Sequence, residues 1–224
     1  MRCAFIIPTL NELSRVSQLI SQLQTIAVQG HEVLVVDGGS QDGTDAALHQ
    51  HGFTVFNSQP GRAKQMNAGA RNTSNDILVF LHADTILPEA AVEKILHACH
   101  KQDWGRFDVS FNEKGVIFKL IATMMNFRSC ISGIVTGDQC LFVKRELFNR
   151  VGGYPDIPLM EDIALSKKLK KFGFPVCLHD RVITSARRWK QNGVLKTILL
   201  MWYLRFAYAV GVSPFKLHRL YYGK

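Results

Sequence analysis

Acidic residues mark three places in this sequence where chemistry could take place. Each follows an apolar or proline-led segment: Asp37 follows residues 33–36, Asp84 follows residues 77–81, and Glu161 and Asp162 follow Pro158. In open α/β sheets, ligands bind beyond the carboxyl ends of the parallel strands and in the loops beside them. We therefore expect these acids to share one site, which would bind a nucleotide and a divalent metal and would contain a catalytic base.

Asp84 is the candidate metal ligand. An unpaired carboxylate at the end of so apolar a strand is costly to bury, and a divalent cation that bridges it to a diphosphate would offset this cost. Mg²⁺ is commonly held by one or two carboxylates together with phosphate oxygens. Structural alternatives stay open for the other acids, because Asp37 could cap a turn, and Glu161 and Asp162 suit the first turn of a helix.

The elements that must position these acids alternate as in an α/β domain. Residues 5–7 and 33–36 are apolar runs typical of buried strands. Between them, apolar residues repeat at helical spacing after Asn11, a good helix cap. A strand, a helix and a strand in this order predict a parallel sheet. Further strands are expected at residues 53–56, 77–81 and 139–143, and further helices at residues 45–50, 64–72, 88–100 and 160–172.

Three more segments complete the pattern. Phe107, Val109 and Phe111 alternate with polar residues, which predicts a half-exposed strand. Residues 116–135 and 194–212 are largely apolar, but Lys and Arg residues interrupt both. Neither segment reaches the run of about 18 uncharged residues expected of a membrane span. Both could be core helices.

The net positive charge of the chain comes from its tail. Of the 27 Lys and Arg residues, nine lie in residues 181–224, which contain no acid, and the remaining 18 balance the 18 Asp and Glu residues. This distribution argues against a nucleic-acid partner and for one basic face. Aromatic residues accompany the tail cations, a composition typical of a membrane interface. The alternative is a helix that packs on the catalytic domain or on another subunit, and the oligomeric state is left open.

The start of the chain bears on its location. No signal peptide is expected, because the apolar run at residues 5–7 is short and Pro8 ends it. The five cysteines are scattered, which favours reduced thiols over disulfides or a metal framework. We expect a cytoplasmic protein, and the basic tail raises the alternative of peripheral attachment to the inner face of the membrane.

Six motifs follow one another along the chain. They are Ile6-Ile7-Pro8-Thr9-Leu10-Asn11-Glu12, Val35-Val36-Asp37-Gly38-Gly39-Ser40-Gln41-Asp42-Gly43-Thr44, Gly61 with Asn67-Ala68-Gly69, His82-Ala83-Asp84-Thr85, Val151-Gly152-Gly153-Tyr154, and Glu161-Asp162. In this order they resemble the family 2 inverting glycosyltransferases with the GT-A fold, and most of all the small bacterial members labelled as radical-SAM or selenodomain-associated. The resemblance covers residues 3–190.

The fold class expected from these observations is α/β. The resemblance implies a GT-A fold with a Rossmann-like, mostly parallel mixed sheet and helices on both faces. We expect this catalytic domain to span residues 1–188, and a basic, aromatic-rich helical tail to follow at residues 189–224.

The resemblance also implies roles for individual residues. Nucleotide contacts would come from Pro8, Leu10, Glu12, Asp37, Arg62, Lys64 and Ala83, with Asp37 on the pyrimidine ring and Arg62 or Lys64 on the phosphates. Asp84 would hold the metal, with His82 as a second candidate ligand. Asp162 would be the general base, with Glu161 beside it as an orienting or acceptor contact. Asp138, Arg188 and Trp189 would contact the acceptor.

The chain departs from the family pattern at three positions. His82 replaces the first acid of the Asp-x-Asp motif, so it is either a ligand or merely packed. Met66 stands where many relatives have Arg, which leaves Arg62 and Lys64 as phosphate contacts. Only Arg188-Trp189 remains of the Gln-x-x-Arg-Trp motif, with Ser185 at the Gln position, which argues against processive synthesis.

The predicted function is therefore metal-dependent, inverting transfer of a sugar to an acceptor hydroxyl. The donor would be a nucleotide-diphosphate sugar, most simply a UDP-sugar, and the cofactor Mg²⁺ or Mn²⁺. An anionic membrane surface or a lipid-linked acceptor is a further candidate partner. Two alternatives remain: a sugar-phosphate nucleotidyltransferase, which should show a glycine-rich loop near the first strand that is missing here, and a non-catalytic module that binds nucleotide or lipid phosphate.

Overall fold

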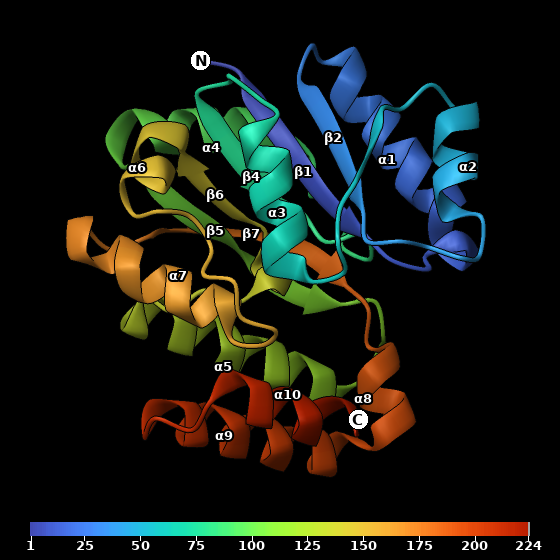
Figure 1. Cartoon of the computed structure of the whole chain (residues 1–224). Coiled ribbons are helices and arrows are strands. Elements are labelled where there is room, and N and C mark those ends of the chain that lie inside the picture. Colours follow the sequence, from blue (N-terminus) through green and yellow to red (C-terminus); the bar gives the residue numbers. More distant parts are fainter. Residues whose placement is uncertain (224) are drawn as a thin grey trace.

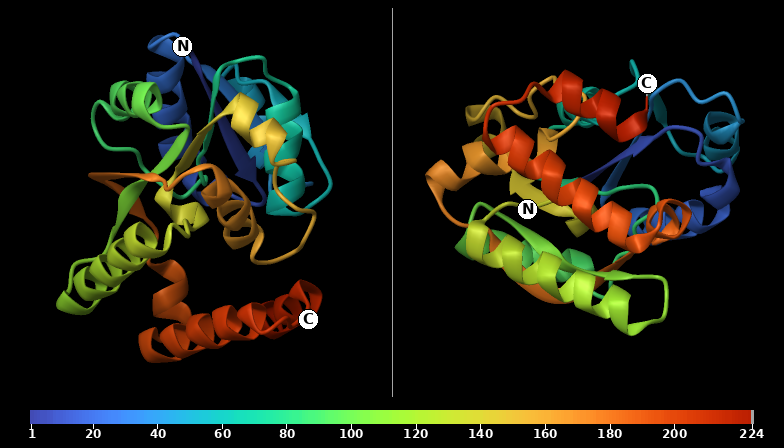
Figure 2. Two further views of the ribbon diagram at one scale, coloured as in Figure 1. Left: turned by 90° about the vertical axis from the view of Figure 1, so that its left-hand side faces the viewer. Right: turned by 90° about the horizontal axis from the view of Figure 1, so that it is seen from below.

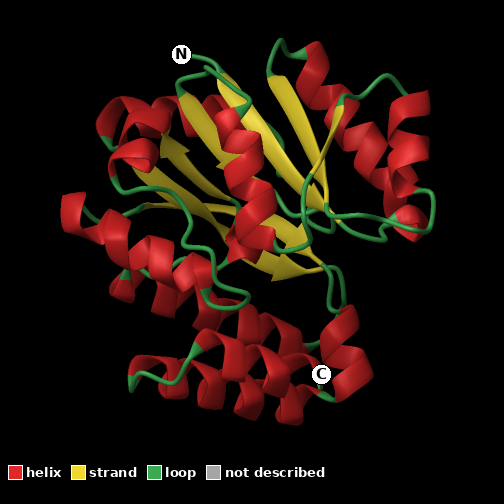
Figure 3. Cartoon of the chain, viewed as in Figure 1, coloured by secondary structure: helices red, strands yellow, loops and turns green. Residues whose placement is uncertain are grey.

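The structure is a computed structural model that describes residues 1–223. A seven-stranded sheet forms its centre, and helices cover both faces (Figures 1 and 3). The strands are β1 (Cys3–Thr9), β2 (Glu32–Asp37), β3 (Val55–Asn57), β4 (Ile77–Phe80), β5 (Trp104–Phe111), β6 (Leu141–Lys144) and β7 (Val176–Thr184). The helices are α1 (Val16–Val28), α2 (Thr44–Gln50), α3 (Arg62–Arg71), α4 (Ala91–Lys101), α5 (Val116–Ser132), α6 (Arg145–Arg150), α7 (Glu161–Leu169), α8 (Arg187–Asn192), α9 (Val194–Ala209) and α10 (Pro214–Tyr222).

The sheet is mixed but mostly parallel. Its order is β3-β2-β1-β4-β6-β5-β7, with β1 to β4 parallel and β5 parallel to β7. Strand β6 is antiparallel to both of its neighbours. Because β1, β2 and β4 run in the same direction, their carboxyl ends lie at one edge and bring the first, second and fourth motifs together. The predicted α/β class, the parallel start of the sheet and the helices on both faces are confirmed.

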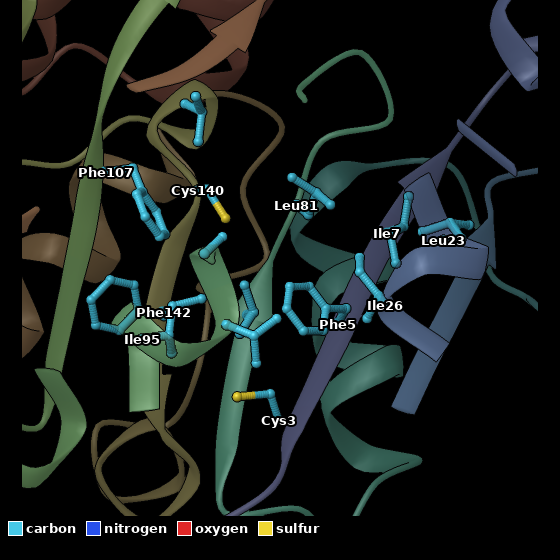
Figure 4. Packing of buried hydrophobic residues seen from close by; sticks show 14 of the residues in the cluster. Cys3, Phe5, Ile7, Leu23, Ile26, Leu81, Ile95, Phe107, Cys140 and Phe142 are labelled. Carbon is cyan, nitrogen blue, oxygen red and sulfur yellow. The ribbon is translucent and has the colours of Figure 1, made fainter. Parts of the chain in front are cut away.

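The alternation along β1 explains why two cores form. Cys3, Phe5 and Ile7 point into a cluster with α1 and α4 (Figure 4), whereas Ala4 and Ile6 point into a cluster with α3, α6 and α7 on the other face. These side chains are fully buried. Burying both faces of a strand requires the continuous apolar run that the sequence shows at this position.

The C-terminal tail folds back beneath the start of α7. Figure 1 shows α8, α9 and α10 at the bottom of the molecule, below the sheet. A third apolar cluster joins Leu204 and Ala207 of α9 and Leu217 of α10 to Met160 and Ile163 beside the last motif. The predicted domain boundary after residue 188 falls within α8 and stays a prediction. No helix in residues 1–223 combines the length and the apolar composition needed to cross a bilayer.

Strand β5 differs from its predicted half-exposed form. Arg106 is fully buried and Asp108 nearly so, because α5 lies over the strand. The two side chains form an ion pair, and Arg106 also donates to the backbone carbonyl of Asn126 on α5, at 3.0 Å. Polar alternation here indicates an internal ion pair under a covering helix, not a solvent face.

Other expectations also need correction. Asn11 does not cap a helix: its φ of 54° is left-handed, and its side chain accepts a hydrogen bond from the backbone N–H of Gln41, at 2.9 Å. A short 3-10 turn at Leu13–Arg15 precedes α1 instead. Helices α5 and α9 are not core helices, because each leaves one apolar side exposed. Strand β7 and helix α6 were not foreseen.

Candidate active site

Asp37 ends β2 and is held by its own loop. One carboxylate oxygen accepts hydrogen bonds from the hydroxyls of Thr9 (3.1 Å) and Ser40 (2.6 Å). The other oxygen accepts from the backbone N–H groups of Gly39 (2.8 Å) and Ser40 (2.7 Å). In this arrangement Asp37 fixes the loop beyond the carboxyl end of β2, and its contact with a nucleobase stays a prediction.

Gln65 of α3 supports the same loop and was missed by sequence reasoning. Its buried side-chain amide donates to the backbone carbonyls of Thr9 and Val36, both at 2.8 Å. A Cβ atom at Gly38 would lie 3.1 Å from this amide, so the glycine permits the close approach. The sequence feature that could have revealed Gln65 is a single Gln on the buried face of a helix that passes the ends of two strands.

Asn67 joins the third motif to the fifth. Its side chain donates to the backbone carbonyl of Tyr154 at 2.8 Å and accepts from the N–H of the same residue at 3.0 Å. A Cβ atom at Gly153, whose φ is 59°, would lie 2.7 Å from the Asn67 side-chain oxygen. Motifs that are more than 80 residues apart are thus fixed together as one unit behind α7.

Glu12 and Asp84 form an acidic pair beyond the ends of β1 and β4. Glu12 Oε2 is buried without a hydrogen-bond partner. Burial, and then the charge of Asp84, raise the pKa of Glu12, while the nearby Arg187 and Arg15 oppose this shift. Arg15 lies 3.7 Å from Asp84 and donates to the Ser185 hydroxyl at 3.1 Å. The pair therefore has acceptor capacity that the protein itself does not fill.

The acidic pair suits a divalent cation. In residues 1–223 no cluster of three or more His, Cys, Asp and Glu side chains is arranged to hold a metal. Mg²⁺ and Mn²⁺ in nucleotide sites, however, take few protein ligands and complete their shell with phosphate oxygens and water. The buried, unpartnered oxygen of Glu12, within electrostatic reach of the Asp84 carboxylate, would suit such a site, and metal binding by Asp84 stays a prediction.

His82 faces the loop that holds Asp162. Its ring lies so close to Gly137 that a Cβ atom there would be 2.4 Å from His82 Nε2. Burial, reinforced by the charge of Arg62, lowers the pKa of His82 to about 3, so the ring is neutral. The contact supports the packed alternative for His82, and a role as metal ligand stays a prediction. Gly137 in turn donates its N–H to Asp162 Oδ2 at 2.9 Å.

The two acids that open α7 differ in environment. Asp162 is half-buried, and its other oxygen accepts from the N–H of Ile163 at 2.8 Å. Glu161 is 7% exposed. Burial and the neighbouring Asp162 raise the pKa of Glu161 to about 7, against the opposing effect of Arg62. The last motif therefore presents one hydrogen-bonded carboxylate and one carboxyl group that titrates near neutral pH.

The predicted nucleotide residues do not all converge. Arg62, at the start of α3, is within electrostatic reach of both Glu161 and Asp84. Lys64 instead donates to the Gln59 side chain at 2.8 Å. Pro8 and Ala83 are half-buried and Leu10 is exposed, beside the ends of β1 and β4. The structure thus brings Arg62 to the acids and leaves Lys64 engaged elsewhere.

Arg15 and Arg187 are cations at this site that the motifs did not reveal. Both influence Glu12, and both line an open cavity of about 320 Å³ together with Lys190 and Ser185. Arg15 lies on the turn before α1. Cations at such positions are usually solvated, so the presence of an Arg there did not indicate a functional residue. Its position depends on α1 following β1, and that of Arg187 on the chain returning after β7.

The acceptor candidates lie between the last motif and the tail. Asp138 Oδ1 is buried without a partner, and burial, together with the charge of Asp162, raises the pKa of Asp138. Arg128 of α5 approaches the same region: burial and the charge of Arg205 lower its pKa to about 10, and its Nη2 atom is also unpartnered. Neither Arg128 nor Arg205 was predicted to lie near the acceptor candidates.

Arg188 and Trp189 are engaged within the tail region. The Arg188 guanidinium stacks 3.6 Å from the ring centre of Tyr221 and donates to its backbone carbonyl at 3.4 Å. Trp189 packs edge-on against Phe111. The two residues therefore fasten α8 to α10 and to β5, and their contact with an acceptor stays a prediction.

Solved structures with a similar fold are GT-A glycosyltransferases. One is the mannosyltransferase PcManGT from Pyrobaculum calidifontis in complex with GDP-Man and Mn²⁺, with a TM-score of 0.64 and 22% identity over 81% of this chain and 56% of that chain. Another is glucosyl-3-phosphoglycerate synthase from Mycobacterium tuberculosis with Mn²⁺, UDP-glucose and phosphoglyceric acid, with a TM-score of 0.59 and 19% identity over 80% and 69%. At these identities the likeness establishes the fold.

Sequence comparison identifies the family. The profile of Glycosyl transferase family 2 matches residues 4–151. The chain therefore belongs to this family, which confirms the predicted family and enzyme class. A curated relative, poly-beta-1,6-N-acetyl-D-glucosamine synthase of Staphylococcus epidermidis, is 23% identical over 217 residues, covering 84% of this chain and 52% of its own length. Curated relatives that it matches are longer: the chain spans between 28% and 52% of their lengths.

Proposed function

We propose that this protein transfers a sugar from a nucleotide-diphosphate sugar, in the first instance a UDP-sugar, to an acceptor hydroxyl with inversion at the anomeric carbon. The observation that carries the proposal is that Arg62 lies within electrostatic reach of Glu12 and Asp84 and also of Glu161, which adjoins Asp162. The first pair suits a metal diphosphate and the second suits an acceptor. The neighbours that bind GDP-Man or UDP-glucose with Mn²⁺ support the donor class and the metal.

The departing diphosphate must be stabilised for the reaction to proceed. A divalent cation bound by Asp84 and Glu12 would supply electrostatic stabilisation of the negative charge that grows on the leaving group. Arg62 lies within electrostatic reach of Glu12, Asp84 and Glu161, and Arg15 and Arg187 also act on the charge of Glu12. These arginines would bind the diphosphate, since charged donors in a site that excludes water act strongly on developing charge.

Asp162 would act as the general base. Its carboxylate is oriented by the N–H groups of Gly137 and Ile163, which leaves lone pairs for the acceptor hydroxyl. Removal of the hydroxyl proton lets the acceptor oxygen attack the anomeric carbon as the bond to the diphosphate breaks. A single displacement of this kind inverts the configuration. Glu161 would orient the acceptor, and its own protonation would set the total charge of the Glu161 and Asp162 pair.

The acceptor would be membrane-adjacent or lipid-linked. This part of the proposal is supported by helices α9 and α10, which combine cations with aromatic residues and pack beside α7. It implies a protein that works peripherally at the inner face of a membrane.

The test of the reaction is a transfer assay with nucleotide sugars in the presence of Mn²⁺. Asp162→Asn should lower transfer by several orders of magnitude and leave nucleotide affinity, measured by calorimetry, within a few-fold. Glu161→Gln is the matched control beside it, and should be the milder change. If Glu161→Gln proves the more damaging substitution, the base is assigned to the wrong carboxylate.

The same assay separates the alternatives. A sugar-phosphate nucleotidyltransferase would release pyrophosphate from a nucleoside triphosphate and a sugar phosphate. A non-catalytic module would bind the nucleotide sugar, with thermal stabilisation of about 2.7 kcal/mol at 100 times its Kd, and show neither transfer nor hydrolysis. Either result would overturn the proposed reaction.

A further inference from the structure

We infer that the outer sides of α5 and α9 together form a docking face for an anionic lipid surface. Each helix carries a stripe of apolar side chains at spacings of three and four residues. The stripes are exposed: Leu120, Met124 and Phe127 on α5 are 53%, 55% and 67% exposed, and Leu199, Trp202 and Phe206 on α9 are 64%, 62% and 68% exposed. Scattered apolar residues are normal on a surface, but two continuous stripes are not.

The fold directs both stripes away from the protein. Helix α5 packs its inner side on β5, and α9 packs its inner side on α7 and α10. In the view from below (Figure 2), α5 and α9 run next to each other in projection, and Figure 1 shows that α9 and α10 lie below α5. The exposed side of each helix is the one opposite these partners, so both stripes face away from the core of the protein.

The charge of this region indicates which partner would bind the docking face. Helices α5, α8, α9 and α10 contain no Asp or Glu but nine Lys and Arg residues: two on α5, three on α8, and two each on α9 and α10. Lys119 and Lys196, which are exposed, adjoin the two stripes. A second copy of this chain would bring like charges together, whereas anionic headgroups complement them, each cation near the surface contributing about 1 kcal/mol.

The side-chain types also fit a bilayer interface. Trp202 and Tyr203 sit on the α9 stripe, and aromatic side chains with one polar atom favour the headgroup level. Helices with one apolar side and a basic flank lie in the plane of the interface. In residues 1–223 no helix can span a bilayer, so attachment through this face would be peripheral.

The inference deepens the proposed function by naming the surface that carries the peripheral attachment, and for its biological meaning it rests on that proposal. Vesicle binding is measured without donor or acceptor, so the face and the reaction can fail separately. Binding is followed by co-sedimentation with phosphatidylcholine vesicles that contain or lack phosphatidylglycerol. We expect binding to the anionic vesicles only, with at least a tenfold loss at about 1 M salt, where the Debye length is about 3 Å.

Matched variants assign binding to the face. Phe127→Glu on α5 and Phe206→Glu on α9 should each weaken anionic-vesicle binding at least tenfold, whereas Val28→Glu, at an 88% exposed position on α1, should not. Lys119→Glu with Lys196→Glu should act like the apolar variants, and Lys101→Glu on α4 is their control. Unchanged melting temperatures show that the variants are folded.

Fluorescence locates the contact directly. Brominated lipids should quench wild-type emission on binding, and Trp202→Phe should remove most of that quenching, since Trp104 is buried and Trp189 is half-buried against Phe111. Absence of binding to anionic vesicles, or equal loss in the Val28→Glu control, overturns the inference. So does a dimer in solution that Phe127→Glu and Phe206→Glu disperse, because the occupant is then a second copy.

Discussion

Glu161 is the residue through which pH should affect the transfer rate. Burial and Asp162 raise its pKa to about 7, so it changes charge within the physiological range. We predict that the transfer rate rises with pH through about 7 as Glu161 ionises and the acceptor contact strengthens. The pH profile of kcat/KM in Glu161→Gln should lose that rise. A profile that keeps it would assign the titration to another group.

The same shift predicts a pH-dependent stability. The folded protein binds the Glu161 proton up to pH about 7, whereas the unfolded chain releases it near the ordinary value of 4.5. Stability from this group is therefore fully present below 4.5 and is lost as pH rises through 7. Glu161→Gln should raise the urea midpoint relative to wild type at about pH 8, and by less at about pH 5. Equal effects at both pH values would contradict the shift.

Asp84 carries the prediction about the metal. Asp84→Asn should remove the Mn²⁺-dependent part of nucleotide diphosphate binding in calorimetry, because the amide offers a neutral ligand in place of a carboxylate. The melting temperature without ligand should change little, since Asp84 is partly exposed and its nearest ion pair, to Arg15, is 3.7 Å long. Glu93→Gln on α4 is the control. Unchanged metal dependence in Asp84→Asn would remove this residue from the metal site.

Residue types alone predicted the candidate acids but not the residues that surround them. Asp84, Glu161 and Asp162 were recognised from local sequence, because each stands at a strand or helix end. Arg15 and Arg128 were not, since each lies on a different element and reaches the site only through the tertiary fold. Single-sequence reasoning finds residues that are unusual where they stand, and it misses ordinary cations that the fold carries to an unusual place.

At the scale of elements, β5 and α5 depend on a buried ion pair. Arg106→Met leaves the nearly buried Asp108 without its buried partner and with only the exposed His179 beside it, at 3.2 Å, and should lower the free energy of unfolding by about 3 kcal/mol. Replacing both residues by apolar ones should recover most of this loss. Lys144→Met, which breaks an exposed pair with Asp103, should cost less than about 1 kcal/mol. Urea denaturation measures all three, and equal effects would show that burial is unimportant here.

The elements that the sequence predicted best are those whose pattern is local. Strands β1, β2 and β4 are continuous apolar runs, and helices α1 and α4 have clear apolar repeats. Strand β7 was missed because the polar residues His179, Asp180 and Arg181 interrupt its apolar residues, and because it lies at an edge of the sheet. The polar face of β5 was misread because the helix that covers it lies later in the chain.

At the scale of the whole molecule, the tail is predicted to support the active site as well as to bind a surface. Truncation after Lys190 removes α9 and α10 and uncovers Met160 and Ile163, which are 8% exposed in the intact chain. We expect a lower melting temperature and a lower affinity for nucleotide, even without lipid. A truncated protein as stable as the full chain would show that α9 and α10 are independent of the catalytic domain.

The position of β6 has a consequence for synthesis of the protein. Strand β4 is complete at Phe80, but the strand that pairs with its free edge, β6, begins at Leu141. Until the ribosome has released those later residues, β4 presents an unpaired and wholly apolar edge, which is a hazard for edge-to-edge aggregation. Because the exit tunnel encloses the most recently made residues, chains stopped after Ser132 expose β4 without β6, whereas chains stopped after Asn192 expose both strands. The first should therefore recruit chaperones more strongly than the second, and proximity labelling on stalled ribosomes can compare them.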